Sequence, residues 1–261
     1  MKLNSKMCII FFAIFMQNMV AAKSIWQDSQ KEKTNLSTPE IETMPKAFRL
    51  LEMDNDKLNE VLNANHKAEM TIDIPMPDGG EECFVLEKTN WVQPNLSEKR
   101  NDIKTFRAWN AHNPKQRLYI VKTKDDFYVI GDSDKGTFFV DRVMQGNEKL
   151  YVSYFAKDAV KPTFQCGVEQ EEEMLFRENE ILESASQSIA GNAWGTELRK
   201  YRMAILWTSG HSANYNNDTT AMVNRDIEII ADMNYVCERD LCITFELSLI
   251  HISEPTRRAI I

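Results

Sequence analysis

The sequence predicts an α+β protein in which an antiparallel β-rich segment precedes one strand–helix–strand unit. Its 43% apolar and 10% aromatic content is typical of a globular chain. Residues 70–156 form a series of short runs rich in aromatic and β-branched side chains, and Gly, Asn or Asp separates the runs. Residues 198–246 instead hold one helical pattern between two apolar strands. These two patterns together predict the fold class.

Residues 1–22 are predicted to be a secretory signal peptide. Lys2 and Lys6 precede an apolar run at 7–16, which is shorter than the ~20 residues that a helix needs to cross a bilayer. Small residues at 20–22 suit a signal peptidase. We therefore expect cleavage after Ala22, secretion to the extracellular space, and no membrane association of the mature chain.

Two segments lead into the predicted sheet. Residues 23–47 are polar and lack periodicity, so we expect a flexible leader there. Residues 48–63 contain a short helix, for which Asp54 or Asn55 is a candidate cap. We assign residues 48–168 to one β-rich domain.

The strands of that domain are marked by composition and by turns. MTIDIP at 70–75 alternates in hydrophobicity and then stops at Asp78-Gly79-Gly80, a turn in which glycine supplies positive φ. The runs CFVLEKTNWV, IKTFRAW, RLYIVKT, DFYVIGD, GTFFVDRV and KLYVSYF follow. Such closely spaced strands predict antiparallel pairing.

Residues 169–197 are acidic and are predicted to be a solvated helix or linker, with a domain boundary near 190–197. Strands are predicted at 198–210 and 241–247. Between them, 218–236 predicts a helix, capped by Asp218 or Thr219. Its apolar residues form one stripe, Met222, Ile229, Met233 and Val236, with Val223, Ile227 and Ile230 beside it. The two strands should pair in parallel. One βαβ unit leaves part of its small sheet uncovered, so we expect further chain to pack there.

The cysteines and histidines form no complete metal motif. The histidines are scattered, and there is no H-E-x-x-H, G-x-S-x-G, P-loop or G-x-G-x-x-G sequence. A net charge of −8 argues against nucleic acid as a partner. In a secreted chain, the four cysteines beyond the signal allow three disulfide pairings. They are Cys83, Cys166, Cys237 and Cys242.

Residues 48–246 resemble a known family in the order and spacing of several stretches. These are FRLLEMDNDKLNEVL, IPMPDGGEECFVLEKTNWVQPNLSEKRNDIKTF, GTFFVDRVMQGNEKLYVSYFAKD, LRKYRMAILWTSG and MNYVCERDLCITFEL. They are similar to the propeptide and the opening catalytic segment of secreted bacterial reprolysin-like zinc endopeptidases, which are metzincins. The resemblance implies a β-rich propeptide domain at 48–168 and the start of a truncated α/β catalytic domain at 198–246.

The resemblance also implies the chemistry of the parent protein. In this family a zinc ion activates water, a glutamate acts as base, and a peptide bond of a protein or peptide substrate is hydrolysed. The zinc-binding helix of the family lies downstream of the matched stretches, and no position here matches it. We therefore expect Zn²⁺ in the full-length parent, none bound by this fragment, and no activity of the fragment itself.

KPTFQCGVE at 161–169 resembles the cysteine-switch element of related proenzymes. There a thiolate occupies the fourth zinc position and keeps the enzyme silent. The resemblance implies that Cys166 is a zinc ligand in the full-length zymogen, although Lys161 and Pro162 stand further upstream than the family pattern has them. A disulfide between Cys83 and Cys166 is the alternative.

Residues 247–257, LSLIHISEPTR, match the translation of a transposase sequencing adapter. We therefore treat 247–261 as an adapter-derived tail, with an uncertainty of one residue because Leu247 also suits the preceding strand. On this interpretation the reading frame breaks off inside the catalytic domain. A second hypothesis is a secreted, non-enzymatic β-rich binding or adhesion protein.

Overall fold

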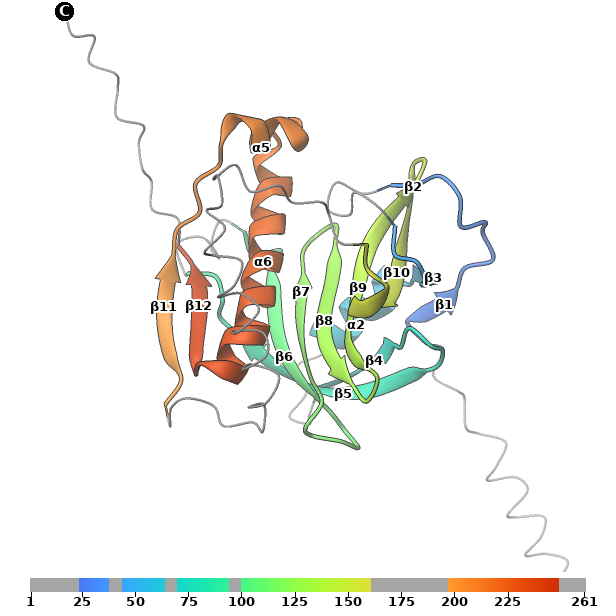
Figure 1. Cartoon of the computed structure of the whole chain (residues 1–261), viewed down its shortest axis with the longest axis horizontal. Coiled ribbons are helices and arrows are strands. Elements are labelled where there is room, and N and C mark those ends of the chain that lie inside the picture. The colour runs from blue at the N-terminus through green and yellow to red at the C-terminus, as the bar shows by residue number, and fades with distance from the viewer. Residues whose placement is uncertain (1–23, 38–43, 64–69, 94–99, 161–196, 249–261) are drawn as a thin grey trace, which may run out of the picture.

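The computed structural model describes residues 24–37, 44–63, 70–93, 100–160 and 197–248, and Figure 1 shows their arrangement. The described residues form an α+β structure: a large antiparallel sheet, one long helix beside it, and a small parallel sheet beyond the helix. The coarse fold class predicted from the sequence is therefore confirmed. Among the described residues, no helix combines the length and the apolar character needed to cross a membrane.

The large sheet has ten strands in the order β1-β3-β10-β9-β8-β7-β6-β5-β4, and β2 pairs with β9. From β4 to β10 each strand pairs with the next one along the chain, as tight turns between alternating runs predict. The strands are β1 (Trp26–Asp28), β2 (Leu36–Ser37), β3 (Arg49–Met53), β4 (Met70–Pro75), β5 (Glu81–Thr89), β6 (Lys104–Asn110), β7 (Arg117–Lys122), β8 (Phe127–Ser133), β9 (Gly136–Gln145) and β10 (Glu148–Phe155), and the short helix η2 (Ala156–Asp158) follows.

Turn chemistry and side-chain bonds shape this sheet. The β9–β10 hairpin closes through Gly146-Asn147, and Gly146 has a φ of 60°, a conformation that glycine adopts without steric cost. The sheet curls until its two end strands, β1 and β4, meet. Trp26 Nε1 of β1 there donates a hydrogen bond to Asp73 O of β4 over 3.0 Å. The result is a nearly closed sheet.

One face of the curled sheet packs around α2 (Asn55–Asn63). Asp54 caps this helix, accepting a hydrogen bond from Lys57 N at 3.2 Å, as the sequence predicts. Leu58 and Leu62 point into the main apolar cluster. Their neighbours there include Ile72, Ile74, Phe84, Phe106, Leu118, Ile120, Phe127, Val129, Phe138 and Tyr151.

The leader is a correction to the sequence prediction. Residues 26–28 and 36–37 are strands of the sheet, and Trp26 is only 4% exposed. Its ring lies against Phe127 and Tyr151, with centroids 5.5 and 5.6 Å away. The segment is polar and aperiodic, and a single buried aromatic side chain produces no periodic pattern that would predict a strand.

The second unit has the predicted strand–helix–strand order. β11 (Arg199–Met203) and β12 (Ile243–Leu247) pair in parallel, and α6 (Thr219–Asp240) connects them. The carboxylate of Asp218 caps α6 by accepting hydrogen bonds from Thr220 N and Ala221 N. The first strand is shorter than the predicted range 198–210. It ends at Met203, and the short helix α5 (Ser209–Asn214) begins before the end of that range.

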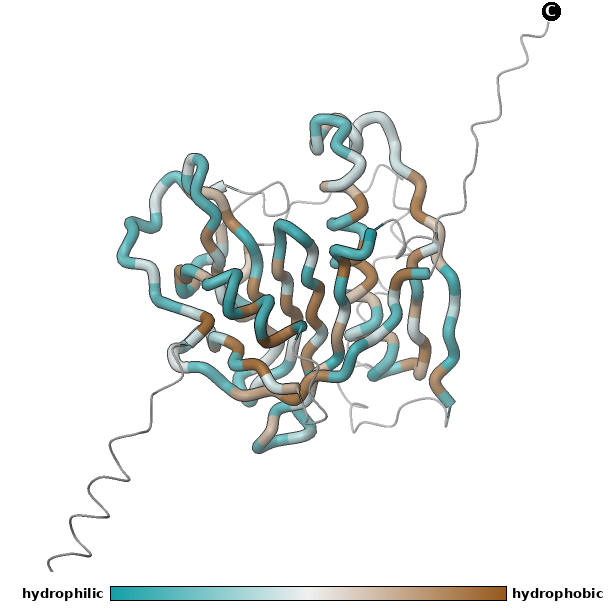
Figure 2. Tube along the Cα trace, turned by 180° about the vertical axis from the view of Figure 1, so that it is seen from behind, coloured by the Kyte–Doolittle hydropathy of each residue, from teal (hydrophilic) through white to brown (hydrophobic). Residues whose placement is uncertain are grey.

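The long helix α6 covers the other face of the large sheet, across β7 and β8 (Figure 1). Figure 2 shows hydrophobic residues recurring along the central strands and along α6, whereas the connecting loops are mainly hydrophilic. The two units that the sequence separates into domains therefore share one apolar cluster.

Candidate functional site

The interface between the large sheet and α6 combines an apolar centre with ion pairs and hydrogen bonds. Its apolar centre joins Val223, Ile227 and Ile230 of α6 to aromatic and aliphatic side chains of β7 and β8. Ile227 is completely buried. The facing residues from the sheet are Tyr119, Val121, Tyr128 and Ile130.

The buried face of α6 differs from the predicted stripe. Val236, which the helical pattern places on that stripe, is 43% exposed, and Ile229 is half-buried. The neighbouring positions 223, 227 and 230 carry the contact instead. Both apolar stripes of α6 have helical spacing, so the sequence pattern does not distinguish them. Packing against the large sheet determines which stripe is buried.

Polar bonds surround this apolar centre. Arg107 of β6 and Glu238 of α6 form a bidentate ion pair, with contacts of 2.6 and 2.5 Å. Tyr119 of β7 donates a hydrogen bond to the same carboxylate over 2.7 Å. The Glu238 side chain is only 6% exposed, so these bonds stabilise a charge that is removed from water.

Four carboxyl side chains gather at this interface, three of them buried and that of Asp232 partly exposed, and we call this group the carboxyl cluster. It comprises Asp126 before β8, Asp141 of β9, and Glu228 and Asp232 of α6. Two guanidinium groups accompany them: Arg225 contacts Glu228 at 3.1 Å, and Arg142 contacts Asp126 at 3.0 Å. The hydroxyl of Tyr154 donates to Asp141, and that of Tyr128 to Asp232.

Burial changes the acidity of this cluster. It raises the pKa of Asp141 to about 7 and that of Asp232 to about 6, because the charged carboxylate loses its hydration. It raises the pKa of Glu228 to about 8, and the nearby charge of Asp126 adds to the rise. Arg225 opposes all three shifts. Four carboxyl groups face two guanidinium groups, so the cluster holds protons near neutral pH.

A second contact between the two units is made by main-chain atoms. Leu247 N donates to Trp91 O over 2.7 Å, and Gln93 N donates to Leu247 O over 3.0 Å. The side chain of Gln93 also bonds Glu246 at 3.1 Å and Ser248 at 2.6 Å. The segment after β5 thereby adds a short parallel pairing to β12.

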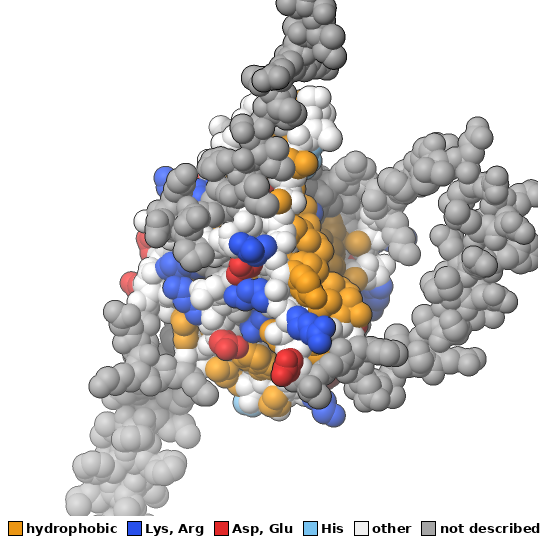
Figure 3. All heavy atoms as spheres, turned by 90° about the vertical axis from the view of Figure 1, so that its left-hand side faces the viewer, with side chains coloured by type: hydrophobic (Ala, Val, Ile, Leu, Met, Phe, Trp, Pro, Cys, Tyr) orange, Lys and Arg blue, Asp and Glu red, His pale blue; other side chains and the backbone are white. Residues whose placement is uncertain are grey.

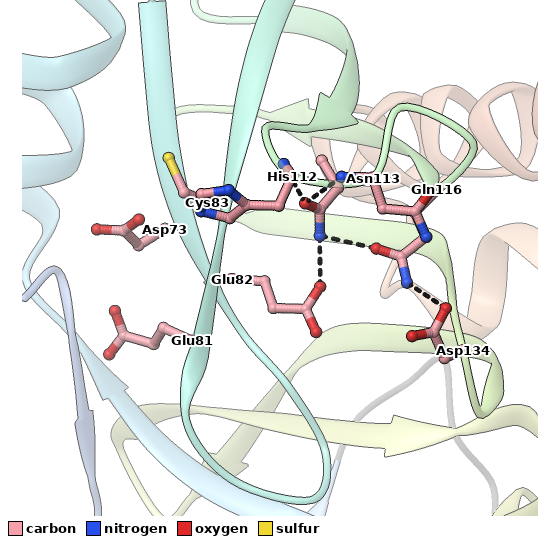
Figure 4. A pocket seen from close by; sticks show the side chains of 9 residues that line it. Asp73, Glu81, Glu82, Cys83, His112, Asn113, Gln116 and Asp134 are labelled. Atoms are coloured by element: carbon pink, nitrogen blue, oxygen red, sulfur yellow. Dashed lines mark hydrogen bonds between the residues drawn. The ribbon is translucent and has the colours of Figure 1, made fainter.

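An open pocket of about 550 Å³ lies at the end of β4, β5 and β6, away from α6. The side-chain amide of Asn110 donates hydrogen bonds to Glu82 and to Gln116, and Gln116 in turn donates to Asp134. Figure 4 shows Gln116 and Asp134 joined by the last of these bonds. The lining is acidic and includes one thiol and one imidazole. It consists of Asp73, Glu81, Glu82, Cys83, Asn110, His112, Asn113, Gln116 and Asp134.

Cys83 lies in this pocket, and within the described part of the chain it forms no disulfide. Burial raises the pKa of the Cys83 thiol, and the negative charge of Asp73 raises it further. Since the thiolate is the reactive form, we expect iodoacetamide to alkylate Cys83 several-fold more slowly at pH 8 than in the urea-unfolded chain. Peptide mapping by mass spectrometry measures both rates. Equal rates would show that the native pocket does not suppress ionisation.

The sequence-predicted site residues are only partly within the described structure. Cys166, the predicted switch cysteine, lies outside the described residues, as do His66 and His251. His112 lies beside Cys83, and His211 is on α5 against the ring of Tyr215. Cys237 forms no disulfide within the described residues. In the described part of the chain, no three His, Cys, Asp or Glu side chains could hold a metal ion.

The carboxyl cluster was missed by sequence reasoning, although a signal was present. Glu228 and Asp232 are four residues apart, so they lie on the same face of α6. Like charges at that spacing destabilise an exposed helix. Such a pair next to apolar residues therefore indicates that the two carboxyl groups are not simply exposed to solvent. The partners Asp126 and Asp141 come from distant strands, and only the fold brings them together.

Comparisons with known proteins identify no family for this chain. No family model matches this chain, and no curated protein matches it. One solved structure, "Structure of a chaperone-substrate complex", aligns with a TM-score of 0.31 and 14% identity, over 46% of this chain and 97% of that chain. A likeness this weak carries no argument about fold or function.

Proposed function

We propose that this chain is the N-terminal part of a secreted zinc-dependent metalloendopeptidase zymogen. In this proposal the large sheet is the core of the propeptide, and β11, α6 and β12 are the first elements of the catalytic domain. The parent enzyme would hydrolyse peptide bonds in protein or peptide substrates. The sequence resemblance supports the family in this proposal, and the interface with α6 supports the role of the sheet as a propeptide that assists folding.

The observation that carries the proposal is the way in which the sheet holds α6. A propeptide that assists folding has to bury the apolar surface of the segment it assists until the rest of the domain is in place. Here Ile227 and Ile230 are fully buried against the sheet. The pair Arg107–Glu238 and the main-chain bonds at Leu247 fix the orientation of the second unit. Such a contact suits a propeptide that positions a partly formed catalytic domain.

Zinc, when bound to the parent enzyme, would supply the activated water for peptide hydrolysis. The described residues do not fit a zinc centre, since none of their His, Cys, Asp and Glu side chains form a three-ligand group. The proposed zinc ligands therefore belong to other parts of the parent protein. In this proposal the described residues hold α6 and β12 in place, and their role is structural.

The second candidate is a secreted, non-enzymatic binding or adhesion protein. The acidic pocket that Cys83 and His112 help to line favours it, because four carboxyl side chains also line this open hollow, which a cationic group could enter. A binding protein of this kind would need no downstream zinc motif.

Sequencing of the source DNA past codon 246, by a method without adapters, tests the proposal first. We expect the open reading frame to continue into H-E-x-x-H-x-x-G-x-x-H within roughly two hundred codons, the domain size that a single fold allows. A stop codon after residue 261, or a continuation without a metal motif, would rule out the protease and leave the binding protein.

The role of Cys166 is tested with matched variants of the full-length zymogen. We expect Cys166→Ser to show premature peptidase activity, because a serine hydroxyl is a poor zinc ligand, and we expect Cys83→Ser to stay silent. The readout is cleavage of a fluorogenic peptide before and after propeptide removal. If the two cysteines form a disulfide instead, both variants should lose stability to the same extent and neither should become active.

A further inference from the structure

The charges between α6 and the large sheet do not balance. Within the carboxyl cluster, Asp126 forms an ion pair with Arg142 at 3.0 Å. The other three carboxyl groups share one guanidinium group, that of Arg225, which influences all of them. When all three are ionised, two negative charges are left without a counter-charge in a space with little water, and this is costly. The contact is electrically neutral only when two of these carboxyl groups hold protons.

The hydroxyl groups around these carboxyl groups supply no positive charge. Tyr154 of β10 donates a hydrogen bond to Asp141, and Tyr128 of β8 donates one to Asp232. Burial raises the pKa of both tyrosines, so they stay neutral at physiological pH. They satisfy one oxygen of each carboxyl group but cannot neutralise its charge.

The remaining charged groups nearby do not remove the excess. Lys122 of β7 lies near both Asp126 and Asp125, so two carboxylates already face its one ammonium group. Asp226 of α6 accepts a hydrogen bond from Trp207 Nε1 over 3.0 Å, which is a contact within the second unit. Neither contact brings a further cation to the three carboxyl groups that share Arg225.

The excess of carboxyl groups lies on the docked face of α6, next to its apolar contact. Glu228 directly follows Ile227, and Asp232 directly follows Ala231; Ile227 and Ala231 are both completely buried against the sheet. The outer side of the second unit differs, since Figure 3, which views the molecule from the β11 side, shows Lys and Arg side chains beside exposed hydrophobic ones. Ionisation of the cluster therefore acts at the surface where α6 meets the sheet.

Docking of α6 takes up protons at this cluster. In the docked state, burial raises the pKa of Asp232 to about 6, that of Asp141 to about 7 and that of Glu228 to about 8. In an undocked state these side chains regain their hydration, and their pKa values return toward the ordinary value of about 4. Docking is therefore favoured by acid, and this stabilisation is lost as the pH rises from 6 to 8.

We propose that the contact between α6 and the large sheet is a proton-dependent switch, in which the β11–α6–β12 unit docks when the carboxyl cluster is protonated and separates when the cluster ionises. The large sheet has its own core around α2 and remains folded. The switch applies whether or not the parent protein is a protease. In the proposed zymogen, it would keep the catalytic segment on the propeptide in acid and release it above neutral pH.

Amide hydrogen exchange of the full chain, followed by mass spectrometry from pH 5 to pH 8, tests the switch. Each measured rate is divided by the intrinsic rate of the same peptide at that pH, because intrinsic exchange itself accelerates with pH. An undocked helix of this length is only marginally stable, so undocking exposes its amides. We expect the opening equilibrium of α6 to rise roughly 100-fold over this range, because each proton released contributes up to about tenfold per pH unit. The strands β7 to β10 should keep their protection.

Two variants separate the cluster from a general effect of charge on α6. Glu228→Gln removes one ionisable group and still offers an amide oxygen to Arg225, so we expect the rise to shrink to about tenfold. Asp240→Asn is the matched control, because it removes the same charge from an exposed position of α6. A hydrogen bond from Arg239 lowers the pKa of Asp240, so this group does not titrate in the range and the rise should match the wild type. If Glu228→Gln fails to fold, Asp232→Asn replaces it with the same expectation.

Three results would overturn the proposal. One is an opening equilibrium of wild-type α6 that changes by less than about threefold between pH 5 and pH 8. Another is an equal and simultaneous loss of protection in α6 and in β7 to β10, which would mean global unfolding in place of undocking. The third is the same pH dependence in the cluster variant and in Asp240→Asn.

Discussion

The free energy of unfolding is expected to fall by on the order of 3 kcal/mol between pH 5 and pH 8, since one unit of pKa shift corresponds to about 1.4 kcal/mol. The carboxyl cluster beneath α6 is the reason. Burial raises the pKa of Asp141 to about 7, of Asp232 to about 6 and of Glu228 to about 8. These groups influence one another, so their separate effects do not add fully.

The sign follows from the protons that each state holds. In the unfolded chain, these carboxyl groups ionise near their ordinary pKa, around pH 4. In the folded chain they keep their protons up to pH 6–8. Between these limits the folded state binds more protons, so unfolding releases them and a rise in pH favours unfolding. The stabilisation is complete below about pH 4 and is lost as the pH rises through 6–8.

Two other carboxyl groups act in the opposite direction but outside this window. A hydrogen bond from Arg49 lowers the pKa of Asp28, and one from Arg100 lowers that of Asp102. Their contribution disappears only when the pH falls below their ordinary range near 4. Burial also raises the pKa of Asp226 on α6, so this group acts in the same direction as the carboxyl cluster between pH 5 and pH 8.

Urea titrations at half-unit steps from pH 5 to pH 9 measure this slope. We expect Asp141→Asn to flatten it and to be more stable than the wild type at pH 8, because the amide still accepts the Tyr154 hydrogen bond and carries no charge. Asp56→Asn, at an exposed position of α2, is the control and should leave the slope unchanged. A wild-type stability that is constant or that rises between pH 5 and pH 8 would contradict the buried cluster.

Ile227→Ala is expected to cost about 3 kcal/mol, the typical effect of truncating a buried isoleucine. Ile227 is completely buried between α6 and the large sheet. Its loss leaves a cavity at the centre of the contact, so α6 should open before the rest of the molecule. Amide hydrogen exchange should then become faster along α6 and β12 than in β7 to β10.

Ile229→Ala is the matched control, because it makes the same change two residues further along the same helix. Ile229 is half-buried and is not part of the apolar cluster with the sheet, so a loss below about 1 kcal/mol is expected. Equal losses for the two variants would mean that α6 does not dock on the sheet through the face containing Ile227.

Most local elements could be predicted from the sequence. The alternating runs between 70 and 156 all form strands of one antiparallel sheet. Asp54 caps α2, and Asp218 caps α6, as their side-chain chemistry predicts. The parallel pairing of β11 and β12 follows from the helix that connects them. Each of these features depends on residues that are close together in the chain.

The burial of Trp26, the face of α6 that is buried, and the carboxyl cluster were decided by the tertiary structure. Trp26 pairs with residues about fifty and one hundred positions away. Asp141 and Asp232 influence each other only because the Asp141 side chain lies on the face of the sheet that α6 covers.

Periodicity, caps and turns act over a few residues, so the strands, the helices and the succession of two kinds of unit can be predicted from the amino-acid sequence. That the two units share one core and enclose an excess of carboxyl groups between them depends on the fold. Burial and desolvation follow from which distant surfaces meet, and no local sequence pattern encodes this.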